Sequence, residues 1–276
     1  MASQPIAVLN RELIESVPIT HRGLHYGDGV FETIAVDTSN ACLLWEEHLA
    51  RLERGARVLG LAFERDRIES DVQFALSCSA SGQQRVLKLS LLRAGQQRGY
   101  TPGLNGQSDV LVSVSPWSTS QDDFRLVDGD VALSPQGVLQ GLKTHNSLEY
   151  VIAARALVEK GAQEAVLCDD QGYMVEGTRS NLFWVNSTGT LSTSKLDRCG
   201  VTGVVREVLL KRAMEDGLPI KLSRATPDAL AQSPEIFVTN SLLGVQSVTH
   251  YKERTLKQFN VAARVRDFMA GAILAH

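Results

Sequence analysis

The sequence predicts a mixed α/β protein of two domains, and three observations support this fold class. Stretches with apolar residues at helical spacing alternate along the chain with shorter stretches that alternate or run apolar, as strands do. The chain has 276 residues, which favours two ordinary domains over one. Residues 116–123 are mostly polar and without periodicity, as linkers are. We therefore expect an α/β domain at 1–115 and a second domain at 124–276.

The first half of the chain combines strands and helices. Apolar runs or alternation predict strands at residues 6–9, 85–92 and 109–114, and a further strand that ends at Val36. Helical spacing predicts helices at residues 44–59 and 66–80. The strand that ends at Val36 follows a loop that starts at His21, and this stretch contains three glycines, Gly23, Gly27 and Gly29. A second long loop, residues 93–102, carries arginines and a tyrosine between two core strands, and such loops often carry function.

The second half continues the same mixture. Short strands are expected at residues 131–133, 165–168, 173–175, 181–185, 219–222 and 236–239. Helices are expected from Asn146 to a glycine cap at Gly161, and at 204–214, 227–231 and 256–275. In this arrangement Lys143 lies in a loop directly before a helix, and Glu176 lies at the end of a strand.

Composition excludes several classes of protein. With 43% hydrophobic residues, 21% charged residues and a formal net charge of −3, the chain has no electrostatic bias toward nucleic acid. Neither a signal-peptide pattern nor a stretch of ~20 apolar residues occurs, so we expect neither export nor a membrane partner. The four cysteines are scattered without metal-ligand or disulfide-like spacing, and this suggests free thiols in a reducing cytoplasm.

Three polar features of the second half suggest one kind of chemistry. Lys143 precedes a helix, Glu176 ends a strand, and the turn of Val201, Thr202 and Gly203 leads into another helix, where free N–H groups and a hydroxyl can bind phosphate. An aldehyde-binding lysine, a carboxylate for a ring nitrogen and a phosphate site together describe pyridoxal phosphate. Each feature also has a plainer interpretation, because the lysine can be a solvated surface charge and the threonine a helix cap without a ligand.

Five motifs narrow this choice when they are taken together. They are RGLHYGDGVFET (22–33), HLARL (48–52), LKTHN (142–146), EGTRSNLF (176–183) and GVTG (200–203). In this order they resemble the fold type IV pyridoxal phosphate enzymes, the class IV aminotransferases and their relatives. The resemblance extends from near residue 20 to near residue 250. It implies a smaller N-terminal α/β domain and a larger C-terminal pseudo-barrel domain that carries the Schiff-base lysine.

The resemblance also implies roles for individual residues. Lys143 would form the Schiff base with pyridoxal 5'-phosphate, and Glu176 would face its pyridine nitrogen. The phosphate would be held by Arg51 and by the turn of Val201, Thr202 and Gly203, with Thr239 and Asn240 also near the cofactor. Substrate contacts are expected from Arg98, Tyr100, Phe31 and Asn240. His21 stands where the family more usually has an aspartate. Taken alone, Arg51 would normally be interpreted as a solvated charge on an amphipathic helix, and only the resemblance singles it out.

Within the family, TNSLLGV (239–245) and the lysine motif are most similar to the aminodeoxychorismate lyases. D-amino acid aminotransferases usually have a tyrosine where this chain has Phe31, and branched-chain aminotransferases carry Gly-Thr-Ala where it has Asn240 and Ser241. The implied reaction converts 4-amino-4-deoxychorismate to 4-aminobenzoate and pyruvate, a step of folate biosynthesis, in a cytoplasmic homodimer that acts on a small molecule. The alternatives are an aminotransferase of either kind, or a phosphate-ligand binding protein without catalysis.

Overall fold

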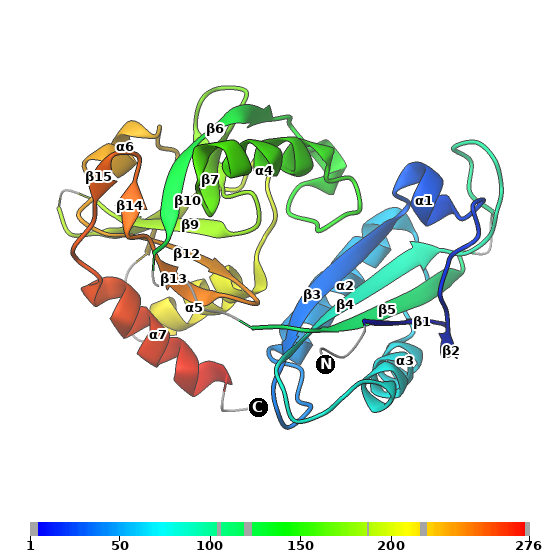
Figure 1. Cartoon of the computed structure of the whole chain (residues 1–276). Coiled ribbons are helices and arrows are strands. Elements are labelled where there is room, and N and C mark those ends of the chain that lie inside the picture. Colours follow the sequence, from blue (N-terminus) through cyan, green and yellow to red (C-terminus); the bar gives the residue numbers. More distant parts are fainter. Residues whose placement is uncertain (1–4, 104–105, 119–122, 187, 216–219, 274–276) are drawn as a thin grey trace. The chain divides into compact units, whose positions relative to one another are not determined.

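The computed structural model describes residues 5–103, 106–118, 123–186, 188–215 and 220–273. The chain forms two units (Figure 1). The first comprises Met1–Thr119 together with Leu142–Asn146, and the second comprises Ser120–Gly141 and Ser147–His276. Within the expected linker, 116–123, residues 119–122 lie outside the described part of the chain. The separate assignment of Leu142–Asn146 differs from our expectation that the second domain carries the lysine.

The first unit is an antiparallel sheet with two long helices. Its elements are β1 (Ile6–Leu9), β2 (Glu12–Leu13), α1 (Arg22–Tyr26), β3 (Gly29–Val36), α2 (Trp45–Leu59), α3 (Arg65–Cys78), β4 (Arg85–Arg93) and β5 (Ser108–Pro116). The strand order is β2-β1-β5-β4-β3, so β3 is an edge strand of this sheet. All strand pairs are antiparallel.

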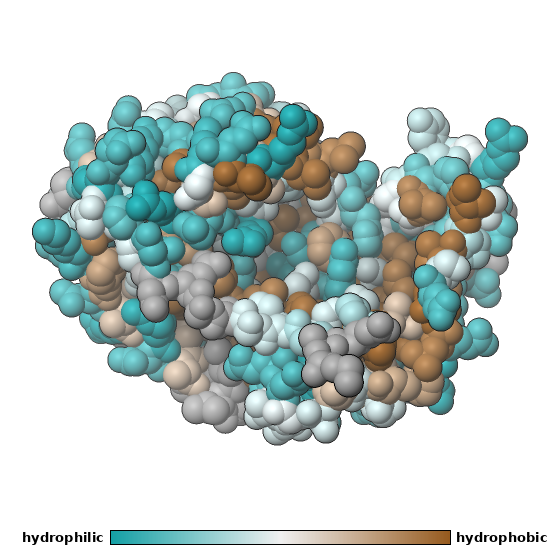
Figure 2. Space-filling view, viewed as in Figure 1, coloured by the Kyte–Doolittle hydropathy of each residue, from teal (hydrophilic) through white to brown (hydrophobic). Residues whose placement is uncertain are grey.

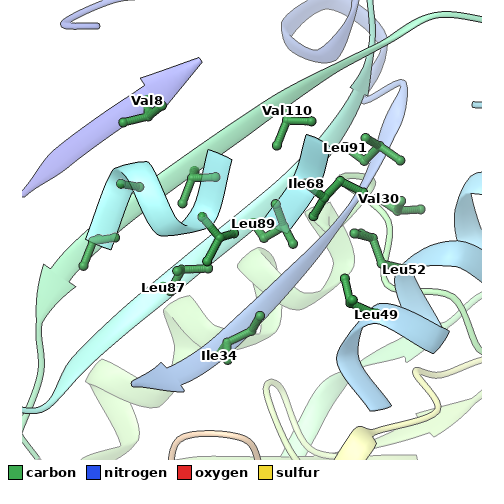
Figure 3. Close-up of a cluster of buried hydrophobic side chains, with 14 of the residues drawn as sticks. Val8, Val30, Ile34, Leu49, Leu52, Ile68, Leu87, Leu89, Leu91 and Val110 are labelled. Atoms are coloured by element: carbon green, nitrogen blue, oxygen red, sulfur yellow. The ribbon is translucent and has the colours of Figure 1, made fainter. Parts of the chain in front are cut away.

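One face of this sheet carries the core of the first unit. Every second residue of β3, β4 and β5 is buried there against apolar residues of α2 and α3 (Figure 3). Val30 and Ile34 of β3 and Leu49 and Leu52 of α2 belong to this cluster. Because side chains alternate along a strand, the residues between the core positions, such as Phe31, face the other side.

The lysine segment lies along the free edge of β3. Thr144 forms an antiparallel bridge with Val30, Phe31 donates its backbone N–H to the carbonyl of Lys143, and His145 donates to that of Gly29. These bonds explain why Leu142–Asn146 groups with the first unit, although the chain around it belongs to the second. Alternation from this register places Thr144 on the core face, and Lys143 and His145 on the opposite face with Phe31.

The second unit contains two five-stranded sheets. Its elements are β6 (Arg125–Leu133), η1 (Gly137–Leu139), α4 (Leu148–Lys160), β7 (Glu164–Asp169), β8 (Met174–Glu176), β9 (Asn181–Val185), β10 (Leu191–Ser194), α5 (Val204–Glu215), β11 (Ile220–Ser223), α6 (Asp228–Ala231), β12 (Ile236–Asn240), β13 (Gly244–Ser247), β14 (His250–Tyr251), β15 (Arg254–Thr255) and α7 (Asn260–Ile273). The strand orders are β11-β10-β9-β12-β13 and β15-β14-β6-β7-β8.

Buried aromatic residues join the strands of the second unit. All five residues of β9 are buried, and its Phe183 ring stacks on Phe237 of β12 with centroids 5.0 Å apart. Trp184 of β9 packs in a core cluster with residues of β6, β7, β8 and β12. Helix α4 lies against β6 and β7, and α5 against β11 and β12. The strand ends that carry Glu176, Asn181 and Thr239 are therefore fixed by a packed core.

Most of the expected elements are present, with shifted ends. Gly161 ends α4 in the left-handed conformation, with φ of 57°, which confirms the predicted glycine cap. Strand β6 starts at Arg125 rather than at residue 131, and α7 starts at Asn260 rather than at 256, while residues 274 and 275 lie outside the described ranges. The prediction missed α1, β2, η1, β10, β13, β14 and β15. Among the helices of the described ranges, none has both the length and the apolar character for a bilayer crossing.

Candidate active site

Lys143 lies on the face of the first unit's sheet opposite its core, beside an aromatic ring and a second lysine. Its Nζ is 4.5 Å from the centroid of the Phe31 ring, and Nζ of Lys88 is also 4.5 Å from that centroid. The His145 ring lies 5.0 Å from the same centroid. Burial, followed by the charges of Lys88 and Lys143, lowers the pKa of His145 to about 4, so this imidazole is neutral at pH 7.

Arg51 is buried on the core face of the same sheet. It is only 5% exposed, so its interpretation as a solvated helix charge is wrong. Its Nε donates to Oε1 of Glu32 at 2.8 Å and its Nη2 to Oε2, while Nδ1 of His48 lies at Oε2 as well. Burial raises the pKa of Glu32, but Arg51 and His48 outweigh it and lower the pKa to about 2. Glu32 is therefore an anion that orients the Arg51 guanidinium.

Arg98 and Tyr100 lie on a loop whose backbone is anchored. The guanidinium of Arg22, which is buried, donates to the carbonyls of Gln97 and Gly99 at 2.9 Å each. The Arg98 and Tyr100 side chains are exposed, and Tyr100 is 90% exposed. Within the described ranges, Arg98 forms no hydrogen bond or ion pair. The structure thus places these two residues on the surface of the first unit and does not bring them to Lys143.

His21, which replaces the family's usual aspartate, caps α1. Its Nδ1 accepts a hydrogen bond from the backbone N–H of Gly23 at 3.0 Å, as a capping aspartate oxygen does. Its Nε2 lies 3.2 Å from Oδ2 of Asp109. An imidazole that accepts through Nδ1 carries its proton on Nε2, so it can donate to this carboxylate. His21 therefore keeps the cap and adds a link to β5.

Glu176 is the central residue of a polar cluster in the second unit. It is 3% exposed and ends β8. Its Oε1 accepts from the hydroxyl of Tyr150 at 2.6 Å and from the backbone N–H of Val201 at 2.9 Å. Its Oε2 accepts from Nδ2 of Asn181 at 3.0 Å. Donors on both oxygens favour the charged form of a buried carboxylate, so Glu176 can hold a cationic N–H group.

Asn181 connects the other candidate residues of this unit. Its Nδ2 also donates to the carbonyl of Val201, and its backbone pairs with that of Thr239. A Cβ atom on Gly203 would lie 1.8 Å from Oδ1 of Asn181, so this position requires glycine. Asn181 thus brings together Glu176, the turn at 201–203 and Thr239. The sequence did not identify Asn181 as a site residue.

The turn before α5 differs from our expectation in one respect. The backbone N–H of Val201 donates to Glu176, and that of Thr202 donates to the carbonyl of Gly141 at 3.0 Å. These two groups are therefore not free for an anion. The N–H groups at the start of α5 remain for that purpose, because the first turn of a helix has no internal acceptors. The hydroxyl of Thr239 is buried without a hydrogen-bond partner in the described structure.

Asn240 holds the turn between β12 and β13. Its Oδ1 accepts from the backbone N–H groups of Leu242 and Leu243 at 2.9 and 2.7 Å, and its Nδ2 donates to the carbonyl of Arg179 at 3.2 Å. The side chain therefore fixes the backbone that follows Thr239.

Comparison with known proteins gives a consistent result. The family model described as amino-transferase class IV matches residues 29–251. The aminodeoxychorismate lyase of Vibrio harveyi is 29% identical over 240 residues, which cover 84% of this chain and 86% of that protein. The crystal structure of 4-amino-4-deoxychorismate lyase from Pseudomonas aeruginosa is 32% identical, with a TM-score of 0.86 over 96% of this chain and 98% of that one.

The branched-chain amino acid aminotransferase of Escherichia coli, also a solved structure, is 21% identical, with a TM-score of 0.84 over 99% of this chain and 95% of that one. Lyases and aminotransferases thus share this fold, and identity is higher to the lyase structure. The family match over residues 29–251, together with 32% identity along nearly the whole length of a solved lyase, shows that this chain belongs to the class IV aminotransferase family.

Proposed function

We propose that this protein is a pyridoxal phosphate-dependent lyase that converts 4-amino-4-deoxychorismate to 4-aminobenzoate and pyruvate. The observation that carries the proposal is the 32% identity to a lyase of this kind across 96% of the chain. The turn after Thr239 supports it, because this is where the lyase-like sequence occurs and where Asn240 fixes the backbone. Through 4-aminobenzoate, the reaction belongs to folate biosynthesis.

The donor set within each unit fits pyridoxal 5'-phosphate chemically. Glu176 is a buried carboxylate with donors on both oxygens, as a partner for a protonated ring nitrogen requires. The phosphate would be held by the start of α5, by the hydroxyl of Thr239 and by the guanidinium of Arg51. The Thr239 hydroxyl has no hydrogen-bond partner in the described structure. Lys143 would attach the aldehyde covalently. When bound, the cofactor would withdraw electrons from the substrate carbon that carries the reacting nitrogen.

Lys143 is also the base of the proposed reaction. Its Nζ removes the proton from C4 of the substrate, and the electron pair left there expels the enolpyruvyl oxygen from C3. The released enolpyruvate takes up a proton, which the Lys143 ammonium can return, and becomes pyruvate. The ring becomes aromatic, so no amino-group acceptor is needed. The Phe31 ring and the neutral His145 lie on the same face of the sheet as this amine, so His145 adds no second positive charge beside it at pH 7.

We assign the substrate's two carboxylates to cationic and polar groups. Arg98 and Tyr100 are proposed as contacts, and their exposure on an anchored loop leaves them accessible to ligand or to a neighbouring subunit. Phe31 would pack against the substrate ring. Asn240 would contribute through the turn that it fixes.

The protein is further proposed to be a cytoplasmic homodimer. The four cysteines are free thiols, and this supports a reducing compartment. Several large apolar side chains of α4 are exposed, including Leu148, Val151, Ile152 and Val158. In Figure 2, hydrophobic atoms lie among polar ones at the position of α4. An exposed apolar face of this kind is typical of a subunit interface.

The function is tested by offering the purified protein two reactions in parallel. A lyase releases 4-aminobenzoate from 4-amino-4-deoxychorismate, whereas an aminotransferase makes glutamate from an amino acid and 2-oxoglutarate. Formation of glutamate without 4-aminobenzoate would favour an aminotransferase of the D-amino acid or branched-chain type. A protein that binds the cofactor and catalyses neither reaction would be a binding protein, and would contradict the proposal.

A further inference from the structure

Tyr150 occupies an unusual place beside Glu176. It lies in the first turn of α4, and its ring packs against the cluster of Leu133, Val175 and Cys199. The hydroxyl reaches out of this apolar cluster to Oε1 of Glu176 at 2.6 Å. Burial, followed by the charge of Glu176, raises the pKa of Tyr150 above its usual range. The phenol therefore keeps its proton and acts as a donor to the carboxylate.

The hydrogen bond has an electrostatic consequence for Glu176. A donor to a carboxylate stabilises the anion and makes it a weaker base. Oε1 receives two donors, Tyr150 and the N–H of Val201, whereas Oε2 receives a hydrogen bond from Asn181. Arg206 and the Cys199 thiol also interact electrostatically with Glu176.

We propose that Tyr150 is a positioning residue, which fixes Oε1 of Glu176 and keeps this carboxylate weakly basic, so that a proton shared with the cofactor's ring nitrogen stays on the nitrogen. The inference rests on the proposed function of Glu176. Without the phenol, the carboxylate binds the shared proton more strongly, and the ring nitrogen carries it for a smaller fraction of the time. The protein would then bind the cofactor normally but withdraw electrons from the substrate less effectively.

Tyr150→Phe tests the proposal, because it removes only the hydroxyl and keeps the ring in its cluster. Tyr251→Phe is a matched control, since Tyr251 is also buried and donates its hydroxyl to a carboxylate, that of Asp128. Both variants and the parent are loaded with pyridoxal phosphate labelled with 15N at the ring nitrogen. The chemical shift of this nitrogen reports its protonation directly, which a change in stability alone does not alter.

We expect the 15N shift to move toward that of the neutral ring in Tyr150→Phe and to stay at the parent value in Tyr251→Phe. The kcat for 4-aminobenzoate formation should fall about tenfold to a hundredfold, as expected for loss of one hydrogen bond to a charged group. The KM for the substrate should change by no more than about twofold, because Tyr150 is assigned no substrate contact.

The outcomes separate this inference from the proposed function. An unchanged 15N shift and kcat in a folded Tyr150→Phe protein would overturn the role of Tyr150, even if the parent is an active lyase. A parent that gives no 15N signal of a bound, protonated ring would overturn the proposed function instead. If Tyr150→Phe does not fold, 4-aminophenylalanine at position 150 provides the test, because this weaker donor should move the shift toward that of the neutral ring, and an unchanged shift would contradict the proposal.

Discussion

At the scale of single residues, the candidate site consists of charges that are held by specific partners. Arg51 is oriented by Glu32, and Glu176 by Tyr150, Asn181 and a backbone N–H group. Such partners matter because a buried charge without hydrogen bonds is costly, and because a fixed charge is already oriented when the ligand binds. Substitution of a site residue therefore also changes the state of its partner.

Substitution of Arg51 can separate the loss of a cofactor contact from the loss of stability caused by a partner left unpaired. Arg51→Ala should weaken cofactor binding by about tenfold to a hundredfold and also destabilise the protein, because Glu32 would remain buried without its partner. Adding Glu32→Gln should recover much of the lost stability but not the affinity. Dialysis followed by cofactor titration, with thermal unfolding in parallel, measures both. A double variant that regains full cofactor affinity would show that Arg51 has a structural role only.

Glu176→Gln tests the charge of the carboxylate. An amide retains a hydrogen bond to the ring nitrogen but no longer favours its protonation, so we expect cofactor retention with a loss of about two orders of magnitude or more in 4-aminobenzoate formation. Stopped-flow absorbance after mixing with substrate distinguishes binding from turnover. Unchanged turnover would mean that another residue faces the ring nitrogen.

At the scale of elements, the periodicity of apolar residues predicted the long helices and strands and missed the short ones. Helices α2 and α3 and strands β4 and β5 have nine or more residues each, so their patterns were visible. Strands β14 and β15 have two residues each and leave no pattern. Helix α1 was missed because its cap is a histidine, and glycine-rich sequence more often forms a loop.

The candidate site was predictable from motifs only in part. The motifs gave Lys143, Glu176 and the turn at 201–203, but Tyr150 and Asn181 became recognisable only through their hydrogen bonds to Glu176. The pairing of the lysine segment with β3 joins residues more than one hundred positions apart. Such pairing depends on tertiary contacts and has no local signal.

This edge segment has a pH dependence of its own. His145 has a folded pKa of about 4, below its ordinary value of 6.5, so between these values the unfolded chain binds more protons than the folded one. Stability therefore falls as pH falls from 6.5 toward 4, and it is fully retained above 6.5. We expect a loss of about 1 to 2 kcal/mol between pH 6.5 and 5. Urea unfolding of the parent and of His145→Gln measures it, and equal losses in both would contradict the assignment.

At the scale of the whole molecule, the exposed residues of α4 predict assembly. Val151 is 60% exposed on this helix, and a charge at this position should oppose association of an apolar face. We expect the parent to be a dimer in light-scattering chromatography and Val151→Asp to be largely monomeric. Val58→Asp, on α2, is the control, because Val58 is an exposed helix valine outside this face. A dimer that persists in Val151→Asp would place the interface elsewhere.

The most direct test of the account is the balance of products from 4-amino-4-deoxychorismate when no oxo acid is present. The proposed lyase needs no amino-group acceptor, so the holoenzyme should release 4-aminobenzoate and pyruvate in equal amounts over many turnovers. Lys143→Ala should fold and release neither above background, because the amine provides the covalent and basic chemistry. Formation of 4-aminobenzoate at the parent rate by Lys143→Ala, or its absence with the parent enzyme, would contradict the account.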